Sequence, residues 1–558
     1  MRRRAVLLMV VFFSVPMISW ADDYYWIDPS GGELGDSTKW NPASTPGEDD
    51  YVYFTEPNSY TVWLDDNYNF GRMTVEGSDL TLDLNGYEYT LDTTDDYNCS
   101  VVIGNYATGS VTVRNGGVYS HDLFIARNGG DSGGRLDLSG AGTFWMGHEI
   151  DGPWFGFFYG AAGDADVSVT DGAQLIHGHG QCGIGTEGTA VFDIDGQDSE
   201  WFVGGFFEMS AYGTTTTNVS NGGRARMGYL TMATYRGSEA TINLTGVDQT
   251  TELAIENGWW DDVSLFIGGS GKGIINLTDS FMYNQGNTVI GQKGGGKGEL
   301  NIDAGSSADC QGSVAVGGSL EAAGGEGLIN VAGTLNCARA GGQSMIVWPD
   351  GVVRLDIGWI IMDYEIVLAS PIDLQGGTLE GWGTIFAQVN NYGGVVAPGA
   401  GGDGYDDWKV LNIGYDYTQD ADATLKIPIA GISSGGWSYW NYGGLNVSGA
   451  AALDGYLDVD LWDGFEPAYT DEYVIVEAAS VSGKFINAAS EYVFEDGTFE
   501  VVYEPDRVIL THYESEPRCA KYPMGDLNQD CRVNLLDLAV MAGSWLTCGL
   551  EPGEACGF

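Results

Sequence analysis

The most specific chemical pattern in the chain is a run of oxygen-bearing side chains near its C-terminus. They stand at positions 1, 3, 5, 9 and 12 of a loop that starts at Asp526, and position 7 offers a backbone carbonyl. The six expected ligands are Asp526, Asn528, Asp530, the carbonyl of Arg532, Asn534 and Asp537. Calcium is a hard cation that prefers oxygen ligands at this spacing. The loop is therefore predicted to bind one calcium ion.

A short helix is expected directly after the loop. Apolar side chains recur at helical spacing from Leu535 to Leu546, and Gly549 and Pro552 end the pattern. Position 6 of the loop is Cys531 instead of the usual glycine, which costs about 1 kcal/mol unless a disulfide holds the turn. The alternative interpretation of these residues is a solvated Asp- and Asn-rich turn before a helix.

The order Gly-Asp-x-Asn-x-Asp, Val-Asn-x-x-Asp and apolar helix resembles one repeat of a type I dockerin, an EF-hand-like calcium module of extracellular polysaccharide-degrading systems. The resemblance covers residues 524–547 and implies calcium as the ion and a cohesin-like protein as a candidate receptor. A dockerin has two such repeats, and residues 503–524 do not supply a second one. The resemblance therefore bears more directly on calcium binding than on docking.

Other groups with chemical potential are few. His177, His179 and Cys182 form a local set of metal-ligand types, and a strand would place both histidines on one face. In an exported protein we expect Cys182 to be buried or disulfide-bonded instead. Aromatic residues in the longer loops could stack on sugars or pack between coils. They are Trp154-Phe155, Phe157-Phe158-Tyr159, Trp201-Phe202, Phe206-Phe207 and Trp259-Trp260.

The main part of the chain, which must position these groups, is built from sequence repeats. A signature of two apolar residues around a small polar one recurs nine times, most often 25 residues apart. The signatures start at Val111, Leu136, Val167, Phe192, Thr217, Ile242, Ile275, Leu300 and Ile329. Two or three short strands per repeat, with turns too short for a crossover helix, predict one coil of a parallel β-solenoid, or β-helix. We expect the nine signature strands to stack in register as one parallel sheet.

Two further patterns support the coils. An apolar residue followed by Gly or Ala precedes most signatures, as in Ile103-Gly104, Ile184-Gly185 and Met232-Ala233. The central polar residues Asn218, Asn243, Asn276, Asn301 and Asn330 should form a ladder along one side, which we interpret as structural hydrogen bonding.

The Gly-rich repeats resemble the passenger regions of autotransporter-like exported bacterial proteins. Tyr25-Trp26 and Trp40-Asn41 resemble the N-terminal cap of that family, and motifs between residues 374 and 419 resemble its final rungs. From residue 443 to 510 the pattern changes and predicts a small antiparallel, β-sandwich-like cap. The expected fold is all-β, with a signal peptide (1–21), an N-terminal β cap (22–98), solenoid repeats (99–370), terminal rungs and cap (371–513) and a small helical calcium module (514–558).

The N-terminus and the charge indicate export. Three arginines, an apolar run and Ser19-Trp20-Ala21 have the three regions of a secretory signal peptide. No later segment offers about 18 consecutive apolar residues, so no transmembrane segment is expected after cleavage. A net charge of −54 disfavours nucleic acid as a partner. The protein is expected to be secreted, extracellular or at the cell surface.

Eight cysteines in an exported chain predict disulfides. Four lie in the last 40 residues, where two bridges are expected and three connectivities are open: Cys519, Cys531, Cys548 and Cys556. Cys310 and Cys337 are about one repeat apart and should approach each other in adjacent coils.

The function expected from these patterns is a non-catalytic structural or adhesive role, with calcium as the cofactor. The alternative is a carbohydrate-active enzyme, either a polysaccharide lyase or a glycoside hydrolase, or a carbohydrate-binding protein on a β-helix scaffold. A lyase would need a base such as Arg224 or Arg226, and a polysaccharide would then be the partner.

Overall fold

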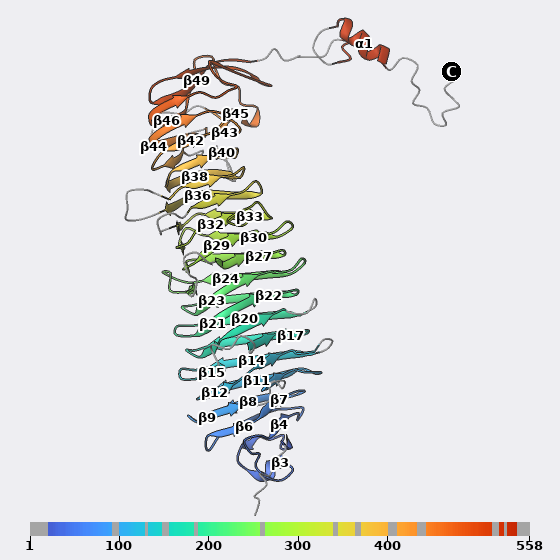
Figure 1. Ribbon diagram of the computed structural model, residues 1–558. Helices are drawn as coiled ribbons and strands as arrows, with labels where there is room; N and C mark the ends of the chain where they lie inside the picture. Colours follow the sequence, from blue (N-terminus) through green and yellow to red (C-terminus); the bar gives the residue numbers. More distant parts are fainter. Residues whose placement is uncertain are drawn as a thin grey trace, which may run out of the picture.

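The protein is a long rod of stacked β-coils (Figure 1), seen in a computed structural model. The structure describes residues 21–91, 100–128, 132–147, 156–183, 188–256, 263–338, 344–362, 370–399, 410–431, 442–515, 524–528 and 533–543. A typical coil contributes three short strands, and each strand pairs in parallel with its counterpart in the next coil. The predicted all-β parallel solenoid is therefore confirmed.

One face of the rod, here called the signature face, contains all nine predicted signature strands. They pair in parallel and in register, so that Val111 lies beside Leu136 and Thr217 lies beside Ile242. The predicted single stack is confirmed. The strands of this face are β2 (Gly32–Glu33), β5 (Ser59–Trp63), β8 (Asp79–Asp83), β11 (Gly109–Arg114), β14 (Gly133–Ser139), β17 (Asp164–Thr170), β20 (Thr189–Asp195), β22 (Thr214–Ser220), β24 (Glu239–Thr245), β27 (Lys272–Thr278), β30 (Lys297–Ile302), β33 (Glu326–Val331), the first halves of β36 (Gly351–Met362) and β38 (Thr378–Phe386), β40 (Val395–Pro398), β43 (Thr424–Ile429) and β45 (Tyr456–Leu461).

The second face follows the signature face along each coil. Long strands bend from one face to the next, and β36 pairs with β33 through its first half and with β34 through its second. The strands of the second face are β6 (Tyr68–Phe70), β9 (Glu88–Leu91), β12 (Gly117–Ser120), β15 (Phe144–Gly147), β18 (Gln174–His177), β21 (Glu200–Met209), β23 (Arg224–Met232), β25 (Glu252–Ile255), β28 (Phe281–Asn284), β31 (Ser307–Cys310), β34 (Thr334–Cys337), the second halves of β36 and β38, β41 (Val410–Ile413), β44 (Gly444–Leu453) and β46 (Glu472–Gly483).

The third face closes each coil before the chain turns back to the signature face. Its strands are β1 (Asp23–Trp26), β4 (Tyr51–Phe54), β7 (Arg72–Val75), β10 (Val101–Ile103), β13 (Leu123–Ile125), β16 (Gly156–Tyr159), β19 (His179–Cys182), the second halves of β21 and β23, β26 (Val263–Ile267), β29 (Asn287–Ile290), β32 (Val314–Val316), β35 (Met345–Val347), β37 (Ile372–Leu374), β39 (Val389–Asn391), β42 (Tyr417–Gln419) and the second halves of β44 and β46.

The corner after the third face explains the recurring apolar-Gly or apolar-Ala step. Gly104 has a φ of 72° there, and a Cβ at this position would lie 2.0 Å from the carbonyl oxygen of Gly133 in the next coil. Ala126 and Ala233 keep the same left-handed conformation at their corners. The predicted step Ile184-Gly185 lies outside the described residues.

Alternating side chains of the three faces fill the interior of the rod. Trp201 and Phe192 are fully buried and stack with ring centroids 4.3 Å apart. Trp26 and Trp40 pack edge to face at the N-terminal end, where β3 (Trp40–Asn41) pairs antiparallel with β1. These two buried tryptophans close the first coils.

The parallel stacks extend beyond residues 99–370 in both directions. Residues 51–91 already pair with later coils, and β44 and β45 remain parallel to the strands before them. Pairing becomes antiparallel only where β46 meets β49 (Arg507–Ser515), so the change expected near residue 443 occurs later. The sequence pattern misses these coils because their lengths differ, and the paired residues Tyr60 and Leu80 are only 20 positions apart.

The C-terminal end of the rod is closed by antiparallel strands. β47 (Glu491–Phe494) and β48 (Gly497–Tyr503) pair with each other, and β48 also pairs with β49. The only α-helix in the described part of the chain, α1 (Leu535–Gly543), lies outside the rod (Figure 1). Among the described residues, no helix has the length and hydropathy needed to cross a membrane.

Candidate calcium loop and outer faces of the solenoid

The predicted calcium loop is described in part. Asp526, Asn528, Asn534 and Asp537 lie in the described residues, whereas Asp530 and Arg532 lie outside them. Helix α1 follows the loop as predicted, and the Asn534 Oδ1 accepts a hydrogen bond of 2.7 Å from the Leu536 N–H at the helix start. The expected disulfides of this module also fall on undescribed residues.

Asp537 ties the beginning of the loop to the start of the helix. Its Oδ1 accepts hydrogen bonds from the N–H groups of Leu527 and Asn528, at 2.6 and 3.2 Å. Its Oδ2 accepts one from the Asn534 N–H at 2.7 Å. The Asn534 N–H first, and then the other two, hold the pKa of Asp537 below its usual value. Position 12 of the loop is therefore an anion that accepts hydrogen bonds from the backbone of positions 2, 3 and 9.

The donors present fit calcium in type. Asp526 and Asp537 are both less than a tenth exposed, and they share one loop with the side-chain oxygens of Asn528 and Asn534. A carboxylate has about four lone-pair positions, and three on Asp537 already receive N–H groups. Asp537 can thus offer calcium only one more contact. Within the described residues, no group of three or more His, Cys, Asp or Glu side chains is placed to hold a metal ion.

The histidine pair does not form a metal site. His177 ends β18 and is fully buried, where its Nε2 accepts from the Trp201 Nε1–H at 3.0 Å. Its Nδ1 lies 2.9 Å from the carbonyl oxygen of His179, to which it donates. Burial lowers the pKa of His177 to about 3. The expectation that both histidines share a face is wrong, because the chain leaves β18 at Gly178 and His179 starts β19 on the third face.

The described cysteines are free thiols. Cys310 and Cys337 are register partners on β31 and β34, so their predicted approach in adjacent coils is confirmed, without a bridge between them. Cys182 is also free and buried, with its Sγ 3.2 Å from the Thr215 Oγ1. Burial raises the pKa of Cys182 and of Cys310 to about 12. These thiols are therefore protonated, and they pack as part of the buried core.

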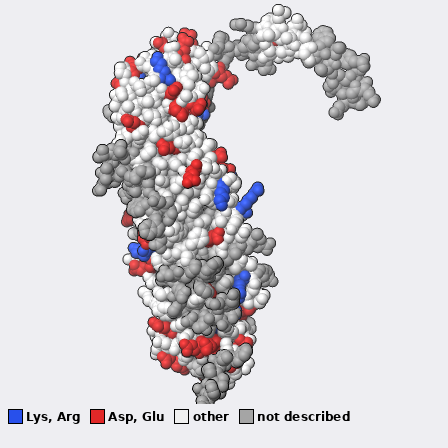
Figure 2. Space-filling model, viewed as in Figure 1, with Lys and Arg blue, Asp and Glu red and all other residues white. Residues whose placement is uncertain are grey.

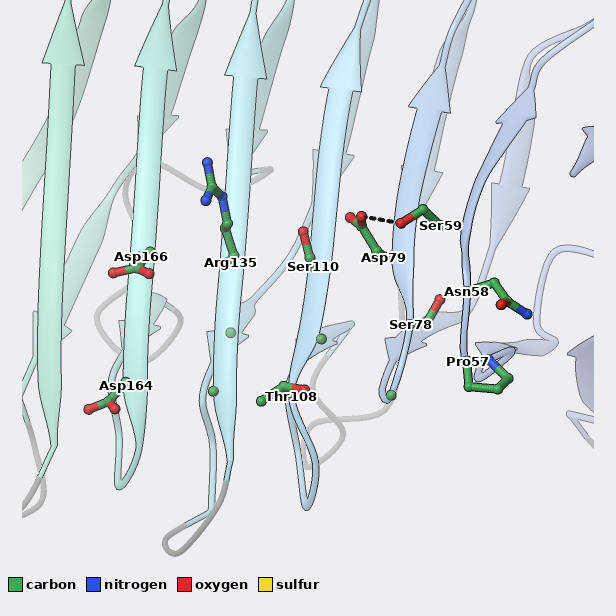
Figure 3. Close-up of a pocket in the computed structure, with 14 residues that line it drawn as sticks. Pro57, Asn58, Ser59, Ser78, Asp79, Thr108, Ser110, Arg135, Asp164 and Asp166 are labelled. Atoms are coloured by element: carbon green, nitrogen blue, oxygen red, sulfur yellow. Dashed lines mark hydrogen bonds between the residues drawn. The ribbon is translucent and has the colours of Figure 1, made fainter. Parts of the chain in front are cut away.

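A polar groove of about 540 Å³ crosses the signature face near its N-terminal end (Figure 3). Figure 3 shows Asp79, Ser110, Arg135 and Asp166 side by side on successive strands, and four glycines also line the groove: Gly77, Gly109, Gly133 and Gly134. Burial raises the pKa of Asp166, and neighbouring aspartates add to the effect although Arg135 opposes it. Arg135 itself donates to Asp137 at 2.7 Å. The groove is acidic, with its one arginine already in an ion pair.

The arginines considered as lyase bases also lie in ion pairs. Arg226 contacts Glu200 at 3.2 Å and also Glu256, and Arg224 lies 3.7 Å from Glu252. The hydrogen bond with Glu256 raises the pKa of Arg226 further. A general base must be unprotonated before it can accept a proton from a substrate. Glu256 and Glu200 keep Arg226 protonated, so this environment favours a structural role for Arg226.

The aromatic residues proposed from the sequence divide between core and surface. Trp201, Phe157 and Phe207 are fully buried, which supports packing between coils, while Phe206 is exposed. Trp154-Phe155 and Trp259-Trp260 lie outside the described residues. Trp359 and Phe386, which none of the sequence predictions included, are exposed on the second face. The sequence pattern that could have identified them is a large aromatic residue at an outward-facing position of a strand with alternating polarity.

Comparison with protein-family models found no match, and comparison with curated proteins found none either.

Proposed function

We propose that the protein is an exported β-solenoid with a structural or adhesive role, presented outside the cell by a calcium-binding, dockerin-like module. The observation that supports this role most directly is the continuous parallel stack, which runs from β4 to β46 and ends in antiparallel strands. Its interior is filled with buried apolar side chains. A filled rod with closed ends offers its outer faces to partners.

The calcium module supports the second half of the proposal. The Asp537 carboxylate accepts hydrogen bonds from the described part of the loop, and Asp526, at the start of the same loop, is also buried. Without a cation, carboxylates confined to one loop repel each other. Calcium would therefore order the loop and the helix that follows, and a cohesin-like protein is the receptor that this module suggests.

Calorimetry on the mature full-length chain tests calcium binding. We expect one calcium ion per chain, and at least a tenfold weaker affinity for Asp526→Ala. Asp79→Ala, which removes an aspartate from the signature face, is the matched control and should bind calcium like the unmodified protein. Absence of binding at millimolar calcium, or equal affinities for the three proteins, would contradict the assignment.

Release from the producing cells tests the presentation. Chelation of calcium should move the protein from the cell-surface fraction into the medium, and Asp526→Ala should be found in the medium even with calcium. Retention of both proteins after chelation would contradict attachment through this module.

A further inference from the structure

A second groove on the signature face differs in chemistry from the acidic one. It encloses about 490 Å³ over β27, β30, β33, β36 and β38. Amide, guanidinium, carboxylate and indole groups line it together. The residues important here are Asn301, Asn330, Asp303, Arg354, Asp356 and Trp382.

The predicted asparagine ladder leads into this groove. Asn330 donates to Asn301 at 2.6 Å, and Asn301 donates to Asn276 at 2.8 Å. The same direction continues through Asn243 and Asn218 to the carboxylate of Asp193. Every amide of the ladder is partly exposed, so it presents polar atoms outward once per strand, about every 4.8 Å.

The ladder ends at Asn330, which also lines the groove. The Asn330 Oδ1 is buried and has no hydrogen-bond partner among the described residues, and the next strand places Arg354 beside Asn330. Arg354 is held by Glu380, which accepts from its Nε at 2.7 Å. The guanidinium is therefore fixed in orientation, and its charge is compensated by a carboxylate.

Aromatic rings continue the groove around the edge of the rod. Trp382 lines the groove, and two residues later Thr384 pairs with Trp359 in the neighbouring strand. Trp359 is 50% exposed and Phe386 is 37% exposed, although both lie on regular strands. Their ring centroids are 5.8 Å apart. Adjacent exposed rings on a rigid sheet present flat apolar surfaces on which a ligand with apolar faces can stack.

We propose that this groove and the adjoining Trp359 and Phe386 bind a neutral polysaccharide, with its chain along the axis of the rod. Amide side chains can donate to and accept from sugar hydroxyls, while indole rings stack on the apolar faces of pyranose rings. The strand spacing is close to the length of one sugar unit. An anionic polysaccharide is disfavoured by the net charge of −54.

The surface charge agrees with this choice. In the view of Figure 2, acidic side chains gather near the two ends of the rod, and those between them are interspersed with Lys and Arg. This inference deepens the proposed adhesive role by naming a ligand class, and it does not depend on the calcium module.

Affinity electrophoresis of the mature full-length chain tests the proposal. The gels contain barley β-glucan, xylan, glucomannan or, as the anionic comparator, polygalacturonate. We expect retardation by at least one neutral polymer, and none by polygalacturonate. The apparent dissociation constant should rise about fivefold or more for Trp359→Ala and for Trp382→Ala, as for truncated aromatic hot spots.

Trp63→Ala is the matched control, because Trp63 is similarly exposed at the far end of the signature face. It should be retarded like the unmodified protein, and a chelator should leave retardation unchanged. If Trp382→Ala fails to fold, Trp359→Ala decides alone, since its side chain is half exposed. The proposal is overturned if no neutral polymer retards the protein, or if Trp359→Ala and Trp63→Ala behave alike. Retained cell attachment after chelation, with polymer binding intact, would count against the calcium module only.

Discussion

The coils bury their apolar side chains, whereas the helix of the C-terminal module exposes them. In the coils, alternate residues of each strand point inward and are fully buried, as Trp201 is on β21. On α1, Leu535 and Leu536 are 80% and 61% exposed, and the buried residue of the helix is Asp537. The body is therefore stabilised by its own interior. The module buries too few apolar side chains to be stabilised in the same way. Small units of this kind are stabilised by a metal ion, by disulfides or by a partner.

This difference predicts where substitutions will be costly. Trp201→Ala should have the largest effect, because the ring stacks on Phe192 and donates a hydrogen bond to His177. We expect a loss of about 3–5 kcal/mol of stability, as for other buried tryptophans. Thermal unfolding followed by circular dichroism measures it. Leu536→Ala, on the exposed helix, is the control, and an equal fall in melting temperature for both would remove the contrast between body and module.

Acid should weaken the body through His177. Burial lowers the pKa of His177 to about 3, whereas an unfolded histidine titrates near 6.5. Between these values the unfolded chain binds a proton that the folded chain does not. The contribution of neutral His177 to the free energy of unfolding is thus fully present above pH 6.5. It is lost as the pH falls toward 3, by up to about 1.4 kcal/mol per pH unit.

His177→Gln isolates this contribution, because it removes the titrating ring and keeps an acceptor for Trp201. Unfolding between pH 7 and 4 should depend less on pH for the variant than for the unmodified protein. Identical pH profiles would show that His177 is not buried in its neutral form.

Interrupting the asparagine ladder should have a smaller effect. Asn276→Ala removes a hydrogen bond to Asn243 and another from Asn301, each worth about 0.5–1.5 kcal/mol. We expect a loss of about 1–2 kcal/mol in the same unfolding experiment. Thr278→Ala, two residues further along β27, is the control on the same strand. If Asn276→Ala is as stable as the control, the ladder is not a source of stability.

The sequence predicted the regular part of the body because one physical rule repeats there. Coils of similar length place an apolar pair and a polar residue at the same points, so the stack through Val111, Leu136 and Val167 follows from spacing alone. The coils from Tyr60 to Leu80 and from Leu379 to Val396 are shorter, at 20 and 17 residues, which hides them from a search for one period.

The candidate sites were harder to predict from the sequence. The calcium loop stays a prediction, made from expected ligands that lie within twelve consecutive positions of the chain; the described part shows Asp537 accepting from the N–H groups of Leu527 and Asn528. His177 was misjudged because the bend at Gly178, which the alternation of a single strand does not reveal, separates it from His179. The groove at Trp382 joins residues from five strands, and their register was needed to bring them together.

Hydrogen exchange of the mature full-length chain, measured by mass spectrometry with and without calcium, tests the contrast between body and module most directly. We predict that amides of the signature face exchange slowly in both conditions. Amides of residues 524–543 should be protected only when calcium is present, because the loop that starts the helix needs the ion. Equal protection of residues 524–543 with and without calcium would contradict the account.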